Sequence, residues 1–545
     1  MRRRNFLRSL AGGALFSALG LKPRRAPARS ARFEHGVASG DPESDRVILW
    51  TRVSGVGPER VAVSWKIASD PQLSDVVAKG STWAAASSDF TVKVDATGLP
   101  AGRTLYFGFE CDGVASPTGR TKTLPTGATR KAQFAVVSCS NYPYGFFHVY
   151  RAIAKRDDLD AVVHLGDYLY EYGLGEYATE HAERLGRVPE PREAIVTLED
   201  YRRRHAQYKA DPDSKAMHGR HPLIAVWDDH ELANDAWQGG AQNHSAEQGD
   251  WRKRRDAAIQ AWLEWMPVRV RHERARTRTF REFHFGDLAA LIMLDTRLFG
   301  RDRQPDAGEG VTPESIEAAM RDPQRRMLGA EQENWFKDAL KRGSNATWQL
   351  IGQQVMVSPT RSPDLEPLLD LESGGSGSSR AYLPPEALAE IVAISKSNPP
   401  MLLDTWNGYP VARATFLNDL EQLATNPVVL SGDLHTSLAG NLVPHGGTEP
   451  VAVEFMTSSV SSPGFAEYLP ETKPGALAAA TIELNPTLTY METARRGWLE
   501  IELTHAECTA SWHLVDTVHS SEHRFEVDGR FRVRAGALDE GMQPV

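Results

Sequence analysis

Two patterns of hydrophobic and polar residues divide this chain. From about Arg32 to Leu124, short runs alternate apolar and polar residues between Gly, Pro and Asp turns, which predicts the strands of a β-sandwich. After the turn-rich stretch Pro125–Thr129, continuous apolar runs alternate with helical segments, as expected for strands covered on both faces. The pattern therefore predicts an N-terminal β-sandwich followed by a larger α/β domain.

The second region contains seven predicted strands and one clear amphipathic helix. The helix runs from Trp251 to about Met266, with its apolar residues in one stripe and its arginines elsewhere. The stretches Leu499–Leu503 and Thr509–Val515 predict a closing hairpin, and the tail from about Ala535, which has no apolar period, is expected to be disordered. The predicted strands are Phe134–Ser138, Ala161–Leu165, Leu223–Trp227, Leu288–Leu294, Trp348–Gln353, Val428–Ser431 and Val451–Met456.

The first 28 residues read as an export signal. They hold seven basic residues, no acid, and a weakly apolar stretch from about Leu10 to Leu21, which is too short for a membrane anchor. The run Arg3–Leu7 resembles the twin-arginine signal, and Ala26–Ala28 offers a small-residue cleavage site. We therefore expect the twin-arginine machinery to deliver a folded chain to the periplasm or the medium. The expected segments are 1–28 (signal), 29–126 (sandwich), 127–534 (the larger α/β domain) and 535–545 (tail).

Charge and cysteine content exclude several classes of protein. The formal net charge of −9 becomes −16 when the seven basic residues of the signal are removed, and such an acidic chain is not expected to bind nucleic acid. No apolar run is long enough to predict a stable membrane span. Three cysteines form no disulfide framework, so an odd one must be buried, paired outside the chain or ligated. Cys139, which follows a predicted strand, is the candidate for ligation.

Polar side chains gather directly after the predicted strands. Asp167 follows an apolar run and a glycine, and Tyr170 lies three residues on, within reach of the same ion if the chain makes a helical turn. A phenolate prefers a strongly Lewis-acidic ion such as ferric iron. Taken alone, Gly-Asp after a strand is more often a turn or a helix cap, so both interpretations remain open.

Two other strand ends have the same character. The run Asp228–Glu231 places four ionisable groups in succession, which would repel one another unless a cation or an ion-pair network compensates, and Asn234 nearby adds another oxygen ligand. Asp433 and His435 lie two residues apart in a predicted extended segment, so both side chains would face the same side and could bind two adjacent ions. The alternatives are a solvated acidic loop and a satisfied core histidine.

Six short motifs together resemble one family. In this order along nearly the whole chain, they are similar to the PhoD-like alkaline phosphatases and phosphodiesterases of the metallophosphatase superfamily. The stretches Gly36–Pro42 and Val47–Arg52 are similar to the sandwich domain of that family. The six motifs are Ser138–Tyr142, Gly166–Glu171, Trp227–Glu231, Leu294–Arg297, Trp406–Tyr409 and Ser431–His435.

The resemblance implies a fold, a cofactor set and a group of site residues. The implied fold is α/β (α+β), with two mixed β-sheets flanked by helices after an N-terminal immunoglobulin-like β-sandwich. The implied cofactors are Fe³⁺ and Ca²⁺, with Zn²⁺ or Mn²⁺ as alternatives. The implied iron ligands are Cys139, Asp167, Tyr170 and His435. Asp167 would also bridge to calcium. The other implied calcium ligands are Asp229, Asp433 and Asn234, and the residues expected to take part in catalysis are His230, Asp167 and Asp229.

One motif departs from the family pattern, and the roles of two residues and one loop stay open. Asn407 stands where the resemblance leads us to expect an aspartate, so it is left out of the expected ligands. Asp295 and Arg297 would either support the site or form a structural pair. The Ser- and Gly-rich loop Leu371–Arg380 would be either a lid or a surface insertion.

The sequence therefore predicts an exported phosphatase or phosphodiesterase that hydrolyses phosphate esters with a metal-activated water at a dinuclear or multinuclear Fe/Ca site. No Gly-x-Ser-x-Gly elbow indicates a serine mechanism. A narrower alternative is a phosphodiesterase acting on phospholipids or wall polymers. An alternative from another class is a calcium-stabilised extracellular binding protein without turnover.

Overall fold

The computed structural model describes residues 30–545 except Pro58, 270–275, 306–312, 370–381, 470–471 and 474. The predicted export signal and the loop Leu371–Arg380 lie outside the described residues. Among the helices of the described ranges, none combines the length and the apolar character that a membrane crossing requires.

The larger of two central sheets has ten strands and mixes parallel with antiparallel pairs. Its middle strands β9, β10 and β11 run parallel, and β19 continues the sheet antiparallel to β9. The hairpin β19–β20 confirms the predicted closing hairpin. In spatial order the strands are β22 (Gln543–Pro544), β21 (Phe525–Arg534), β20 (Glu507–Val515), β19 (Arg496–Leu503), β9 (Ala132–Val137), β10 (Ala161–His164), β11 (Pro222–Ala225), β1 (Val37–Gly40), β2 (Arg46–Arg52) and β5 (Thr91–Thr97).

The second central sheet has seven strands and is also mixed. Strands β13, β14, β15 and β17 run parallel, and β12, β16 and β18 add antiparallel neighbours at its two sides. In spatial order the strands are β12 (Arg281–Phe285), β13 (Ala289–Met293), β14 (Trp348–Gly352), β15 (Pro427–Ser431), β17 (Ala452–Met456), β16 (Ser437–Leu442) and β18 (Leu488–Glu492). All seven predicted strands of the second region lie in these two sheets.

The N-terminal region packs a small sheet against the end of the large one. One apolar core joins β1, β2 and β5 of the ten-stranded sheet to the facing strands of the small sheet. The sandwich therefore shares one of its two layers with the catalytic region, which alternation along the sequence alone did not reveal. The strands of the small sheet are β3 (Val61–Ala68), β4 (Val76–Ala84), β6 (Thr104–Cys111), β7 (Val114–Ala115) and β8 (Gly119–Lys122).

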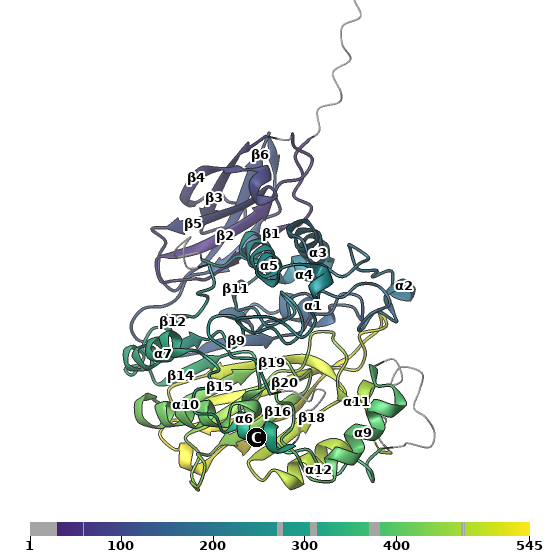
Figure 1. Cartoon of the computed structure of the whole chain (residues 1–545). Helices are drawn as coiled ribbons and strands as arrows, with labels where there is room; N and C mark the ends of the chain where they lie inside the picture. Colours follow the sequence, from purple (N-terminus) through teal and green to yellow (C-terminus); the bar gives the residue numbers. More distant parts are fainter. Residues whose placement is uncertain are drawn as a thin grey trace, which may run out of the picture.

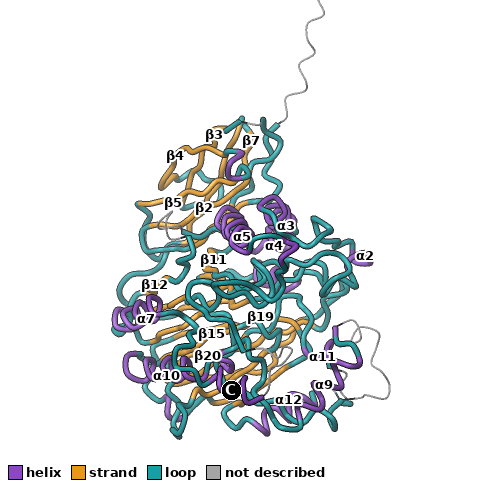
Figure 2. Tube along the Cα trace, viewed as in Figure 1, coloured by secondary structure: helices purple, strands orange, loops and turns teal. Residues whose placement is uncertain are grey.

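Helices cover the outer faces of the two stacked central sheets (Figures 1 and 2). One large apolar core lies between the sheets, a second lies under α1, α3, α4 and α5, and a third lies under α7 and α10. Helices α9, α11 and α12 lie together at one side of the molecule (Figure 1). The helices are α1 (His148–Ala154), α2 (Ala182–Leu185), α3 (Leu198–Ala210), α4 (Pro212–His218), α5 (Trp251–Trp265), α6 (Pro313–Met320), α7 (Ala330–Arg342), α9 (Pro385–Ser395), α10 (Pro410–Leu423), α11 (Phe465–Tyr468) and α12 (Ala476–Leu484).

This architecture confirms the predicted fold class and corrects one expectation. The tail from Ala535 is ordered, because β22 pairs with β21 and the amide of Val545 donates to the carbonyl of Arg530 over 2.9 Å. Met542 is buried in the core between the sheets, so the tail gains both backbone pairing and apolar contact. Sequence periodicity could not show this, because the strand is only two residues long.

Candidate active site

The predicted site residues meet where parallel strands of the two sheets end. Cys139 follows β9, Asp167 follows β10 and Asp229 follows β11, all at the carboxyl ends of neighbouring strands. Asp433 follows β15 of the other sheet. The backbone joins these loops directly, because the amide of Cys139 donates to the carbonyl of Gly166 over 3.1 Å.

Four of these residues have a backbone conformation that L-residues seldom adopt. Their φ angles are positive: 61° at Cys139, 52° at Asp167, 69° at Asp433 and 56° at His435. Each such residue costs on the order of 1 kcal/mol or more, and the cost persists only where the surroundings impose the geometry. Strain gathered on these loops indicates that the fold holds their side chains in place for a function.

Gly166 permits the close approach of two of these loops. Its φ is 117°, and an added Cβ would lie 2.4 Å from the Cβ of Asp228. A side chain at this position would push the loop after β10 away from the loop after β11.

One group of side chains offers a mixed donor set. Ligand atoms of Cys139, Asp167 and His435 lie within 4.8 Å of one another. The Tyr170 hydroxyl lies 3.1 Å from Asp167 Oδ2 and 3.0 Å from His435 Nε2. Ser462 Oγ lies 2.7 Å from the same hydroxyl, so the phenol is fixed in orientation.

His435 has the tautomer that a metal ligand needs. Its Nδ1 lies 2.5 Å from the carbonyl oxygen of Pro463, so Nδ1 carries the proton and Nε2 faces Tyr170 with a free lone pair. Burial lowers the pKa of His435 to about 3, so the ring is neutral. Burial also raises the pKa of the Cys139 thiol and of the Tyr170 phenol well above their ordinary values, so a cation would be needed to ionise them.

A second group consists of carboxylates. Ligand atoms of Asp167, Asp228, Asp229 and Asp433 lie within 4.8 Å of one another. Burial, with repulsion from the neighbouring carboxylates, raises the pKa of Asp167 and of Asp433 well above the ordinary range. Asp229 Oδ1 is buried and has no hydrogen bond among the described residues. The nearest positive charge to this oxygen is Arg297, whose Nη2 lies 3.5 Å away. Bound cations would relieve the repulsion among these buried carboxylates.

His230 lies beside both groups and is held by a carboxylate. Its Nδ1 lies 2.7 Å from Glu171 Oε2, and ligand atoms of His230, Asp167 and Asp229 lie within 4.8 Å of one another. Burial disfavours the charged ring, but the carboxylates, with Asp229 first and Glu171 next, outweigh burial and raise the pKa of His230 well above its ordinary value. In the metal-free chain these charges favour an imidazolium, and Nε2 is left for a group in the cavity.

Three important residues were missed or left open by the sequence. Glu231 accepts backbone hydrogen bonds from Asp167, Tyr168 and Asp228, so it ties the loops after β10 and β11 together. Arg297 is fully buried and donates to Asp228, to Asp433 and to Asp404. Glu171 and Arg297 each lie in a motif that the sequence showed, but their partners come from distant segments. Only the folded chain identifies those partners.

The remaining open positions have local roles. Asn234 lines the cavity described below, and its side-chain amide donates to Gln242 over 3.1 Å, away from the two groups. Asp295 accepts from the Trp227 indole and from two backbone amides of its own turn, which is a structural role. Asn407 donates to the carbonyls of Met401 and Thr360, which an aspartate could not do, and it is not among the residues that line the cavity described below.

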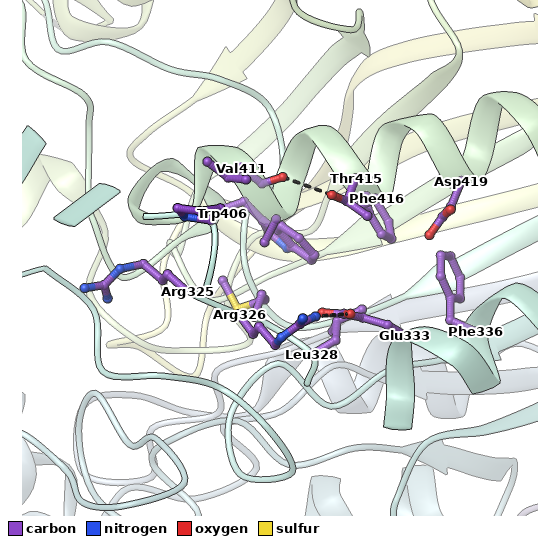
Figure 3. Close-up of a pocket in the computed structure, with 13 residues that line it drawn as sticks. Arg325, Arg326, Leu328, Glu333, Phe336, Trp406, Val411, Thr415, Phe416 and Asp419 are labelled. Carbon is purple, nitrogen blue, oxygen red and sulfur yellow. Dashed lines mark hydrogen bonds and ion pairs between the residues drawn. The ribbon is translucent and has the colours of Figure 1, made fainter. Parts of the chain in front are cut away.

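Several members of the two groups line one part of a cavity of about 620 Å³. Asp167, Asp229, His230, Asp433 and His435 all line it. A smaller cavity of about 50 Å³ lies between α7 and α10 and is crossed by the ion pair of Arg326 and Glu333 (Figure 3). None of the predicted site residues lines that second cavity, which is a packing crevice.

Comparisons with known proteins agree on one family. The family model described as PhoD-like phosphatase matches residues 134–512, and the model described as PhoD-like phosphatase, N-terminal domain, matches residues 20–125. Alkaline phosphatase D of Bacillus subtilis (strain 168) is 36% identical over 454 residues, which span 79% of this chain and 70% of that protein. A solved structure described as that of PhoD is 30% identical, with a TM-score of 0.79 over 96% of this chain and 93% of the solved chain.

Proposed function

The chain belongs to the PhoD-like phosphatase family and is a phosphoric ester hydrolase, and we propose that it is exported and depends on a bound metal cluster. The observation that carries the metal proposal is the convergence of a thiol, a phenol, an imidazole and several carboxylates at one end of the cavity.

The donor set fits two different cations. Cys139, Asp167, Tyr170 and His435 combine sulfur, phenolic oxygen and nitrogen, which suits ferric iron, and Zn²⁺ is an alternative. Asp229 and Asp433 offer only oxygen, as calcium prefers, with Asp167 able to bridge and Mn²⁺ as an alternative. When bound, such ions would neutralise the phosphate oxygens and activate the attacking water. Asn234 is also proposed as a calcium ligand: its Nδ2 donates to Gln242, so its Oδ1 is the atom that could bind a cation.

The chain itself supplies orientation and a proton. Glu171 accepts the Nδ1 proton of His230, which directs Nε2 of the imidazolium toward the cavity. A phosphate ester whose phosphorus lies at the acidic end would receive a hydrogen bond or a proton from this Nε2 at its leaving oxygen. Arg297 pairs with Asp228, which does not line the cavity, and with Asp404, which does, so it offsets part of the carboxylate repulsion and holds these loops together.

Membership of an enzyme family rules out the alternative of a binding protein without turnover. Export by the twin-arginine route stays a proposal that is supported by the sequence of the first 28 residues. The same is true of the boundaries at residues 28, 126 and 534, although the two family models meet near the second of them.

The direct test is turnover of p-nitrophenyl phosphate by the wild type and by Asp167→Asn. Asp167 belongs to each of the three groups of ligand atoms, so the variant should lose nearly all activity. Glu500→Gln, on the distant β19, is the matched carboxylate-to-amide control and should keep it. Unchanged activity in Asp167→Asn would contradict the proposed site.

A further inference from the structure

The cavity has two chemically different ends, and only one is explained by the proposed reaction. The acidic end holds Asp167, Asp229, His230, Asp433 and His435, whereas much of the remaining lining comes from α9, α11, α12 and the loop before Asp404. Leu434 lies between two of the predicted ligands in the sequence and also lines the cavity. The apolar lining, called the wall below, is formed mainly by Leu365, Ile391, Ile394, Leu402, Phe465 and Leu469.

The wall exposes apolar side chains that a folded enzyme normally buries. Ile391, Ile394 and Leu402 are 37%, 50% and 44% exposed, and they gather at the mouth of one cavity. Contiguous exposed apolar surface beside a pocket commonly marks a binding site. Helix α9 buries Val392 and Ser395, whereas Ile391 and Ile394 stay partly exposed and line the cavity.

The apolar wall is a built part of the fold. The Ser395 hydroxyl accepts a hydrogen bond from the amide of Leu365 over 2.9 Å, and Val392 packs in a core with Leu469 and Leu477. The segment after α9 is fixed as well, because the amide of Met401 donates to a carbonyl in the loop after β14.

The hydroxyls of Ser395 and Thr405, which lie among the apolar side chains of the wall, are already used within the protein. The Ser395 hydroxyl donates to the carbonyl of Val392, and the Thr405 hydroxyl donates to the carbonyl of Leu402 and accepts from the amide of Asn407. An ester group rich in hydroxyls would lose water here without gaining partners, which costs free energy. An alkyl group would lose only unfavourable contact with water.

We propose that this wall is a subsite for an alkyl group of the substrate, so that the enzyme prefers phosphate esters carrying an extended apolar chain. The inference rests on the proposed function, since the phosphorus must lie at the acidic end. It favours an alkyl phosphodiester over a polyol-phosphate polymer.

The test is a series of alkyl p-nitrophenyl phosphates from methyl to octyl, assayed below the concentration at which they aggregate, with a glyceryl ester as polar comparison. Each methylene covered by the wall should raise kcat/KM by up to about fourfold, so three covered methylenes give a ratio on the order of 50. The glyceryl ester should stay near the methyl ester.

Variants of the wall assign the effect to its residues. Ile391→Ser and Ile394→Ser should each lower the octyl-to-methyl ratio several-fold, whereas Ile394→Leu should retain it. Val76→Ser, an exposed apolar position on the distant β4, is the matched control and should keep the ratio.

Three outcomes would overturn the inference. A wild-type kcat/KM that is flat across the series would show that no alkyl subsite exists. If kcat/KM still rises steeply with chain length in both Ile391→Ser and Ile394→Ser, the alkyl subsite lies elsewhere. Absence of turnover for every ester, including p-nitrophenyl phosphate, would remove the proposed function and this inference with it, and it is distinguishable from a flat series.

Discussion

Replacing Glu171 by glutamine should change which substrates the enzyme can hydrolyse. Glu171 is fully buried and accepts three hydrogen bonds: from His230 Nδ1 over 2.7 Å, from the backbone amide of Asn234 over 2.7 Å and from Asn243 Nδ2 over 2.9 Å. The last two go to Oε1 and the first goes to Oε2. A glutamine that keeps its oxygen on the two asparagines therefore presents its NH₂ group to His230.

This exchange changes which nitrogens of the His230 ring carry a proton. An NH₂ group donates to Nδ1, so Nδ1 must accept, and His230 becomes neutral with its single proton on Nε2. The loss of the Glu171 charge acts in the same direction, because that carboxylate helps to raise the pKa of His230. A neutral imidazole can still donate a hydrogen bond, but it is a far weaker acid than the imidazolium.

The consequence depends on the leaving group. An alkyl phosphate needs a proton on its leaving oxygen, and general acid catalysis is worth about 10²–10⁴-fold. Nitrophenolate leaves as a stable anion and needs no proton. For p-nitrophenyl phosphate we therefore expect kcat to fall only by the smaller loss of orientation, about tenfold or less. For Glu171→Gln we therefore expect kcat on hexyl phosphate to fall at least about 100-fold, and the ratio of the two substrates to shift by at least about tenfold.

The assay is steady-state kcat for both substrates, with thermal unfolding of each variant to confirm folding. Glu500→Gln, which removes a carboxylate far from the cavity, is the control and should leave the ratio unchanged. Equal losses on both substrates would mean that Glu171 only positions its loop. No loss on either would mean that His230 is not the proton donor.

Three further predictions concern the metal, the buried arginine and pH. Tyr170→Phe should abolish the visible tyrosinate-to-iron absorption band of the purified enzyme, and a band that survives would exclude Tyr170 as the ligand. Arg297→Met leaves buried carboxylates unpaired and should cost about 3–5 kcal/mol in denaturant unfolding; a loss below about 1 kcal/mol would contradict this role. Burial alone would raise the pKa of Glu500, but the hydrogen bonds from His513 and Arg156 outweigh burial and lower this pKa from 4.5 to about 2. The pairing therefore stabilises the fold fully above pH 4.5, and this stabilisation is lost as the pH falls toward 2. The stability difference between the wild type and Glu500→Gln, on the order of 1 kcal/mol at pH 7 because the group is partly solvated, should vanish near pH 2, and a difference that persists there would refute the linkage.

The sequence predicted the strand ends but not the contacts between them. Apolar runs before Asp167 and Asp433 placed both residues after buried strands, and the structure brings them together because parallel strands of two stacked sheets end at one place. Hydrophobic periodicity reports burial of a strand, so it locates such positions well. Their identity as ligands stays a prediction.

Other features depend on long-range packing that periodicity does not report. Arg297 reaches Asp404 and Asp433, more than one hundred residues away, and no spacing in the sequence indicates those pairs. The sharing of β1, β2 and β5 between the sandwich and the ten-stranded sheet is missed for the same reason. The apolar wall could not be predicted from the sequence, because α9, α11 and α12 show no unusual pattern on their own and form the wall only by packing around one cavity.

The most direct test of the central claim is the metal content per chain of wild type and Asp167→Asn, measured by mass spectrometry on protein purified from its native host. The account predicts more than one ion per wild-type chain, including iron, and a clear loss of metal in the variant, because Asp167 belongs to every group of ligand atoms. A metal-free wild type that hydrolyses p-nitrophenyl phosphate, or a variant with the full wild-type metal content, would contradict it.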